Sequence, residues 1–212
     1  MTPLAIVACA ILAYLLGSIP TGYLMARAKG IDIRTVGSGN IGATNVFRAL
    51  GKVPGIITLV IDCAKGVVAV LLVPPVAARA FSVEQTPALA LVSALAVILG
   101  HNYTCWLKFK GGKGIATSAG ALLGLAWLAT LICLGVWVLV FLAGRYVSLA
   151  SIAAAVALPI AVFFTQKTGP LFYLSLALAA LAIWRHRANI RRLCNGTENR
   201  FVRKPKPEAR AS

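Results

Sequence analysis

Long apolar stretches dominate this sequence and restrict its fold more than any other feature. They occupy residues 3–26, 54–78, 86–107, 115–144, 146–165 and 170–184. A bilayer core of ~30 Å takes about 20 helical residues at ~1.5 Å per residue, so stretches of this length are typical of membrane-spanning helices. Of the 212 residues, 59% are hydrophobic and 12% are charged, about half the charged share of a soluble domain. The sequence therefore predicts an all-α integral membrane protein.

The few charges are distributed unevenly between the apolar stretches. Lys and Arg number 21 against 5 Asp and Glu, which gives a formal net charge of +16. Basic clusters alternate between rich and poor along the chain, and the poor ones contain only Arg79 and Lys167. Because cytoplasmic loops carry the excess of Lys and Arg, this alternation predicts an external N-terminus and a cytoplasmic C-terminus.

The stretch 115–144 begins and ends beside basic residues that this alternation places in the cytoplasm, so it must cross the membrane an even number of times. We therefore expect a re-entrant pair or two short helices there, with a turn near Gly124 to Trp127, and seven transmembrane helices in total. Residues 1–198 are expected to form one domain. The basic segment 199–212 contains two prolines, and we expect a disordered cytoplasmic tail near anionic headgroups.

Three polar segments interrupt the apolar pattern, and all three fall on the predicted cytoplasmic face: residues 36–48, 108–117 and 185–198. In the first segment, glycines allow a close backbone approach and Arg48 adds a planar, bidentate charge. Small polar side chains offer hydrogen bonds there, from Ser38, Asn40, Thr44 and Asn45. Such a loop suits a phosphate group, because the phosphate oxygens accept several hydrogen bonds at once.

The second segment contains three glycines around a lysine, at the start of a predicted helix. These residues are Gly111, Gly112, Lys113 and Gly114. The amide groups and the dipole of a helix N-terminus attract anions, and Lys113 would add a point charge. The segment is not a Walker A loop, because Leu107 stands where that pattern needs glycine and Gly114 where it needs Ser or Thr. Nucleotide binding is therefore not predicted.

The third segment places His186 and Asn189 three residues apart, so a helix would turn both toward one ligand. A fourth polar feature lies inside the membrane, where Asp62 and Lys65 stand at positions i and i+3. Buried charges of this kind either pair or line a polar cavity. The sequence leaves open whether Lys65 only pairs with Asp62 or also forms the floor of an anion site.

Other functional classes find no support. Nucleic-acid binding would fit the positive charge, but the tryptophans stand at predicted helix ends, where membrane interfaces attract them. The five cysteines form no CxxC pair, so neither a disulfide framework nor a metal site is predicted. No cofactor is expected.

The polar motifs resemble those of a known family, the bacterial acyl-phosphate-dependent glycerol-3-phosphate acyltransferases called PlsY. The resemblance covers nearly the whole chain and rests on Gly17-Ser-Ile-Pro20, Gly37 to Arg48, Asp62 to Gly66, Gly100-His-Asn102, Phe109 to Gly114, and His186 to Glu198. It implies acyl transfer from acyl-phosphate to the 1-hydroxyl of sn-glycerol 3-phosphate, at the cytoplasmic face of a bacterial inner membrane. The products would be lysophosphatidate and phosphate, in the first acylation of phospholipid synthesis.

The resemblance also implies roles for individual residues, without a metal. Together with the residue patterns above, it assigns catalytic roles to Ser38, Arg48, His186 and Asn189. Substrate or phosphate binding is expected of Gly39, Asn40, Thr44, Asn45, Lys65, Gly111, Gly112, Lys113 and Gly114. The hydroxyl proton would pass to the substrate's phosphate or to His186. The alternative function is a membrane transporter of a phosphorylated solute, although such transporters often contain inverted repeats and none is visible here. A third alternative is a purely structural membrane anchor.

Overall fold

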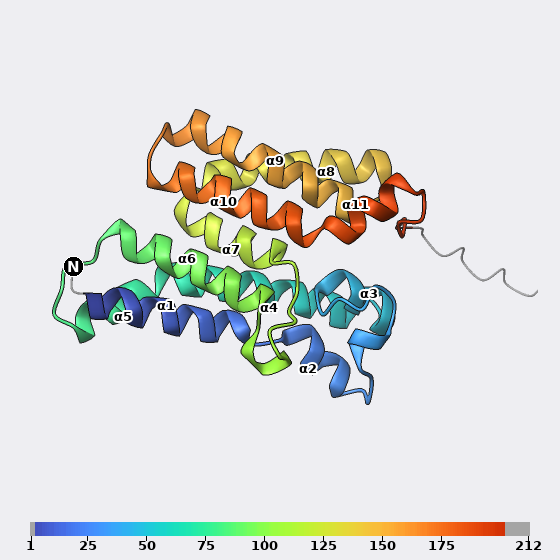
Figure 1. Ribbon diagram of the computed structural model, residues 1–212, viewed down its shortest axis with the longest axis horizontal. Helices are drawn as coiled ribbons and strands as arrows, with labels where there is room; N and C mark the ends of the chain where they lie inside the picture. Colours follow the sequence, from blue (N-terminus) through green and yellow to red (C-terminus); the bar gives the residue numbers. More distant parts are fainter. Residues whose placement is uncertain (1–2, 202–212) are drawn as a thin grey trace, which may run out of the picture.

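The computed structural model describes residues 3–201, and every regular element in that range is a helix (Figure 1). The α-helices are α1 (Pro3–Ser18), α2 (Thr21–Arg27), α3 (Ala43–Leu50), α4 (Lys52–Leu71), α5 (Val73–Ala80), α6 (Pro87–Asn102), α7 (Ile115–Leu125), α8 (Trp127–Gly144), α9 (Val147–Gln166), α10 (Pro170–Arg185) and α11 (Arg187–Cys194). Two 3₁₀ helices are η1 (Ile33–Thr35) and η2 (Cys105–Leu107). Residues 202–212, most of the expected tail, lie outside the described residues.

The apolar stretches form the long helices, as predicted. Within residues 3–201, five segments are long and apolar enough to span a membrane: Pro3–Arg27, Lys52–Ala80, Pro87–Leu107, Trp127–Gly144 and Val147–Gln166. Two shorter apolar helices, Ile115–Leu125 and Pro170–Arg185, accompany them. The protein is therefore an all-helical, multi-pass integral membrane protein.

The stretch 115–144 divides into two helices at Ala126, inside the predicted turn. The expectation that both are short is wrong for α8, whose 18 residues are enough to cross a membrane, whereas α7 has only 11. At the break, two backbone carbonyls accept hydrogen bonds from side chains. Gln166 donates to the carbonyl of Leu125, and the Thr130 hydroxyl donates to that of Ala126.

Glycines let two pairs of helices pack with their backbones in close contact. Between α4 and α7, a methyl group on Gly66 would collide with the carbonyl oxygen of Thr117, and one on Gly120 with that of Cys63. Between α1 and α6, Gly100 lies in the same way against the carbonyl of Tyr14. Small residues at such contacts are typical of membrane helices, which associate through close packing and not through expulsion of water.

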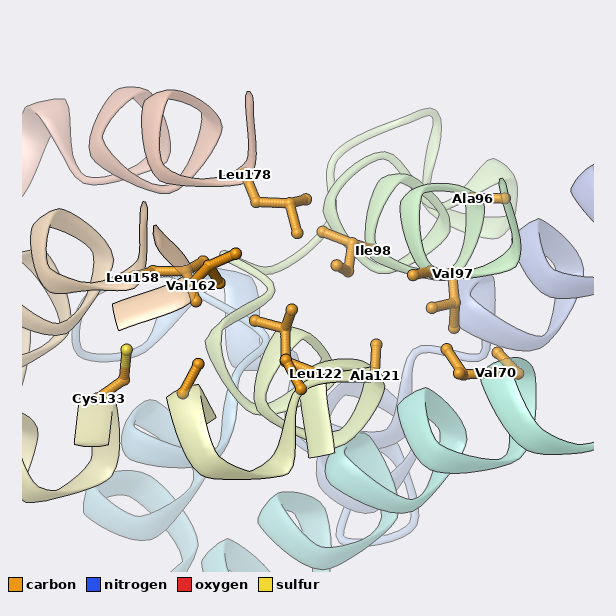
Figure 2. Packing of buried hydrophobic residues seen from close by; sticks show 14 of the residues in the cluster. Val70, Ala96, Val97, Ile98, Ala121, Leu122, Cys133, Leu158, Val162 and Leu178 are labelled. Atoms are coloured by element: carbon orange, nitrogen blue, oxygen red, sulfur yellow. The ribbon is translucent and has the colours of Figure 1, made fainter. Parts of the chain in front are cut away.

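The main core joins two layers of helices. Figure 1 shows α8, α9 and α10 packed as one layer above α6 and α7, with α1 and α4 below. Figure 2 shows Leu122 of α7 beneath Leu158 and Val162 of α9, and Ile98 of α6 facing Leu178 of α10. This packing fixes α7 between α9 above and α4 below, so the start of α7 is held in place.

The polar elements gather at one end of the molecule. Figure 1 shows α3 and α11 at this end, whereas α5 and the turn between α9 and α10 lie at the other. The three polar segments of the sequence thus come together, as the topology argument predicted.

Candidate active site

A cavity of about 610 Å³ opens where the polar segments meet. Much of its charged and polar lining comes from helix ends and loops: Ser38, Asn40, Thr44, Asn45, Arg48, Lys113, His186, Asn189, Arg192, Glu198 and Asn199. Its apolar lining comes from the middle of the helices, including Leu122, Leu131, Leu134, Leu158 and Leu178. The cavity is therefore amphipathic, with a cationic end among the loops and an apolar end within the bundle.

Asn45 shapes the first loop. Its buried side chain donates to the carbonyl oxygens of Ile33, Val36 and Asn40, at 3.2, 2.9 and 2.9 Å, and its Oδ1 accepts from the Ser38 amide at 3.0 Å. All of its polar atoms are therefore engaged by the loop. The Asn40 carboxamide oxygen likewise accepts from the Gly42 amide at 2.8 Å. These two predicted site residues line the cavity but act on the loop backbone.

Two glycines make the tight path of this loop possible. Gly37 and Gly39 have φ angles of +61° and +67°, which side chains rarely allow. Gly39 does not itself line the cavity, whereas Ser38 between them does, as do Thr44 and Arg48. The loop therefore presents two hydroxyl groups and a guanidinium group to the cavity.

The second loop is held against the end of α6. The Gly111 and Gly112 amides donate to the carbonyls of Asn102 and His101, at 3.1 and 3.0 Å. A methyl group on Gly112 would collide with the imidazole of His101. Both glycines were expected to bind phosphate. In the structure their amides are hydrogen-bonded to the end of α6, and neither glycine lines the cavity.

Arg185 holds the same loop from the opposite side. Its guanidinium donates to the carbonyls of Gly111 and Gly112 at 2.6–3.1 Å and lies over the ring of Tyr103. Lys113 and Gly114 follow directly, and both line the cavity at the N-terminus of α7. The first amides of a helix have no partner within it, so the lysine and the helix end together form a cationic, hydrogen-bonding wall.

Lys113 joins the third segment through a chain of hydrogen bonds. Its Nζ donates to Oδ1 of Asn189, whose Nδ2 donates to Glu198 at 2.7 Å. Glu198 also accepts from Ser148 and pairs with Arg192, each at 2.7 Å. The acidic side chain therefore braces an arginine and fixes the Asn189 amide toward the lysine.

Burial changes the protonation of these groups. The pKa of Lys113 falls to about 8, mainly because burial disfavours its charge, and nearby arginines lower it further against the opposing effect of Glu198. Burial also lowers the pKa of His186 to about 4, assisted by the charge of Lys113. For Glu198, burial raises the pKa, but hydrogen bonds from Ser148, Asn189 and Arg192 lower it more.

With a pKa of about 4, His186 is neutral near pH ~7, and one contact shows which ring nitrogen carries its proton. Its Nδ1 lies 2.8 Å from the carbonyl oxygen of Ala182. A carbonyl only accepts, so Nδ1 carries the proton and Nε2 is left as an acceptor. The ring is 3% exposed and lines the cavity.

Lys65 pairs with Asp62 beneath the site. Its Nζ lies 2.9 Å from the Asp62 carboxylate, 2.9 Å from Nδ1 of His101 and 3.1 Å from the carbonyl of Ile19. The cavity lining includes Asp62 and His101 but not Lys65. The structure therefore shows the pairing with Asp62, and Lys65 does not itself line the cavity.

Some lining and supporting residues were not singled out from the sequence. Ser148 stands inside an apolar stretch, Arg185 and Arg192 stand in a basic run, and Asn199 was assigned to the tail. Arg185 and Arg192 lie in the third polar segment, but nothing in its spacing distinguishes them from the other arginines there. Only the fold shows their contacts with the loops.

The fold and the cavity together define a multi-pass membrane protein with an amphipathic, cationic ligand site. Residues 7–196 match the family described as glycerol-3-phosphate acyltransferase. The chain is 52% identical over 191 residues to the glycerol-3-phosphate acyltransferase of Geotalea daltonii, covering 90% of this chain and 95% of that protein. It is 55% identical over 189 residues to the enzyme of Geobacter metallireducens, covering 89% and 94%.

Two solved structures share the fold. The crystal structure of PlsY in its glycerol 3-phosphate form superposes with a TM-score of 0.83 at 41% identity, covering 93% of this chain and 96% of that one. The lysophosphatidic acid form gives 0.81 at 40% identity, covering 93% and 95%. The chain therefore belongs to the glycerol-3-phosphate acyltransferase family, the PlsY type. It is an acyltransferase of phospholipid synthesis.

Proposed function

We propose that this enzyme transfers a fatty acyl group from acyl-phosphate to the 1-hydroxyl of sn-glycerol 3-phosphate. The products are lysophosphatidate and inorganic phosphate. The observation that carries the proposal is the amphipathic cavity, because an acyl chain fits its apolar end while two phosphate groups require its cationic end. The PlsY structures contain glycerol 3-phosphate and lysophosphatidic acid, one substrate and the product of this reaction.

Acyl-phosphate is a mixed anhydride and is already activated, so the enzyme needs no covalent nucleophile. The glycerol C1 oxygen attacks the acyl carbonyl carbon, an ester bond forms, and the bond between that carbon and the phosphate oxygen breaks. The protein contributes orientation and neutralisation of charge. This division of labour accounts for a site rich in cations and hydrogen-bond donors.

Arg48 and Lys113 neutralise the phosphates from two walls of the cavity. Charge-assisted hydrogen bonds to phosphate are about twice as strong as neutral ones. Ser38 and Thr44 add hydroxyl donors, and Gly114 adds the amide end of α7. In this proposal Gly39, Asn40, Asn45, Gly111 and Gly112 shape the two loops that carry these groups, and Lys65 supports the site from beneath through Asp62 and His101.

Asn189 orients Lys113, and His186 accepts a hydrogen bond from a substrate hydroxyl through Nε2. The hydroxyl proton itself passes to the departing phosphate. Burial lowers the pKa of His186 to about 4, which disfavours uptake of the proton by its imidazole.

We also propose seven transmembrane crossings, with the N-terminus outside and the site at the cytoplasmic face of a bacterial inner membrane. The positive-inside pattern supports this orientation. The break at Ala126 supports the count, because α7 and α8 supply the two crossings that the stretch 115–144 requires.

The test of the proposed function is a product assay with the full-length protein in lipid vesicles. Acyl-phosphate and glycerol 3-phosphate should yield lysophosphatidate and phosphate in equal amounts. Acyl coenzyme A in place of acyl-phosphate serves as the donor control and should yield little product. A folded protein that takes up labelled glycerol 3-phosphate unchanged, without forming lysophosphatidate, would contradict the proposal and favour the transporter.

A further inference from the structure

The chain that follows α11 returns to the cavity instead of leaving the fold. Glu198 and Asn199 line the cavity, and two residues later the Phe201 amide donates to the carbonyl of Arg145 at 2.8 Å. Figure 1 shows this red end of the described chain at the same end of the molecule as α3. The family match ends at residue 196, so these contacts lie beyond the matched region.

Phe201 connects two helices that belong to different layers. Its ring centroid lies 5.3 Å from that of Phe47 in α3 and 5.8 Å from that of Phe141 in α8. Tilted and edge-on aromatic pairs attract at these separations. Phe141 in turn stacks on Trp137, a residue of the cavity wall, at 5.0 Å. A row of aromatic rings therefore runs from the cavity wall in α8 to α3.

Arg200 adds a second attachment on the α8 side. Its Nε donates to the carbonyl of Gly144 at 3.2 Å, and its guanidinium lies 5.7 Å from the ring centroid of Tyr146. Residues 199–201 are thus fixed at the α8–α9 turn by the Phe201 amide and the Arg200 side chain, and at α3 by the Phe201 ring.

This fixed backbone meets Arg48. The Arg48 Nη2 donates to the carbonyl oxygen of Asn199 at 3.3 Å, and both residues line the cavity. Among residues 3–201, Arg48 has no carboxylate at ion-pair distance. Its neighbour Phe47 is the same residue that packs against Phe201. The helix that carries the guanidinium and the carbonyl that orients it are therefore both held by Phe201.

We propose that Phe201 is a positioning residue of the acyltransferase, which acts by holding Arg48 in the phosphate-binding end of the cavity. Phe201 does not touch the reacting atoms. It fixes α3 relative to α8 and fixes the Asn199 carbonyl that accepts from the guanidinium. This inference rests on the proposed role of Arg48 in phosphate binding.

The test compares Phe201→Ala with Phe201→Tyr in the full-length enzyme. We expect Phe201→Ala to raise the KM for one phosphate-bearing substrate by roughly three- to tenfold, the range provided by loss of the contact with Phe47, which lies on the helix of Arg48. Phe201→Tyr keeps the ring and should stay near the wild-type value. Phe164→Ala is the matched control, because Phe164 is 71% exposed on α9 and should leave both KM values unchanged.

A double-mutant cycle with Arg48→Ala separates positioning from a general structural effect. If Phe201 acts through Arg48, Phe201→Ala should not raise KM further in the Arg48→Ala background. An equal increase in both backgrounds, or an unchanged KM in the single variant, overturns the inference. If Arg48→Ala itself leaves both KM values unchanged, the proposed phosphate site fails instead. Phe201→Leu serves as the intermediate variant if the alanine variant does not fold.

Discussion

Arg48 and Lys113 approach the cavity from separate elements, and each should contribute a charge-assisted contact of its own. Replacing either by alanine removes about 1.5–3 kcal/mol of binding to a phosphate group, so we expect the KM for a phosphate-bearing substrate to rise about tenfold or more. Steady-state kinetics with each substrate varied in turn measures this change.

The matched controls are Arg79→Ala and Lys167→Ala, which remove the same side chains away from the cavity. Both should leave KM at the wild-type value. If neither Arg48→Ala nor Lys113→Ala changes KM for either substrate, the assignment of the phosphate site is refuted.

The lowered pKa of Lys113 predicts a dependence on pH. Below about pH 8 the lysine is protonated and attracts phosphate, and above that value it becomes neutral. Since kcat/KM reports ionisation in the free enzyme, we expect kcat/KM to fall as pH rises through about 8. Lys113→Arg keeps its charge in this range, so its profile should lose this fall. The same alkaline limb in both proteins would show that another group titrates.

Residue identity alone predicted much of the cavity lining, but not which groups each residue contacts. Asn45 and Gly112 were expected to meet phosphate because amide groups and glycines suit that ligand. In the fold, Asn45 is occupied by four backbone contacts and Gly112 by its packing on His101. A sequence shows which groups are available, whereas only the tertiary contacts show which of them are already occupied.

Among the helices, the close contact of α4 with α7 matters most for the site, because Lys113 stands at the start of α7. Gly120 is held against the backbone of Cys63. Gly120→Ala should therefore destabilise the protein by about 1–3 kcal/mol, the usual cost of overpacking. The thermal unfolding midpoint in detergent should fall accordingly.

Gly135 in α8 provides the matched control for this substitution. A methyl group there meets no atom within 4 Å, so Gly135→Ala should preserve or raise the midpoint, because alanine favours the helix. Equal effects at the two glycines would contradict the close packing of α4 on α7.

The positions of the helices followed from the apolar stretches, and the break at Ala126 from the charges that flank them. The unequal lengths of α7 and α8 did not, because the stretch 115–144 contains no charged residue or proline that would mark how long each helix is. The contacts of Phe201 could not be predicted from the sequence either, because a single aromatic residue within a basic segment forms no periodic pattern.

At the scale of the whole molecule, the proposed orientation is open to a direct test. Cys194 is the exposed cysteine at the end of α11, on the predicted cytoplasmic side. A membrane-impermeant maleimide should label Cys194 in inside-out vesicles but not in intact spheroplasts. Mass spectrometry should locate the label at Cys194, and a Cys194→Ser variant should lose it. Labelling in intact spheroplasts would mean that the topology is the reverse of the one proposed.

The buried pair of Asp62 and Lys65 also has a consequence for how the protein enters the membrane. Both charges lie on α4, one helical turn apart and 2.9 Å from each other. Because the pair is contained in one helix, it forms as soon as that helix does, before α6 supplies His101. The buried part of the helix can therefore enter the membrane with its two charges already paired, without a partner from a helix that is still being synthesised.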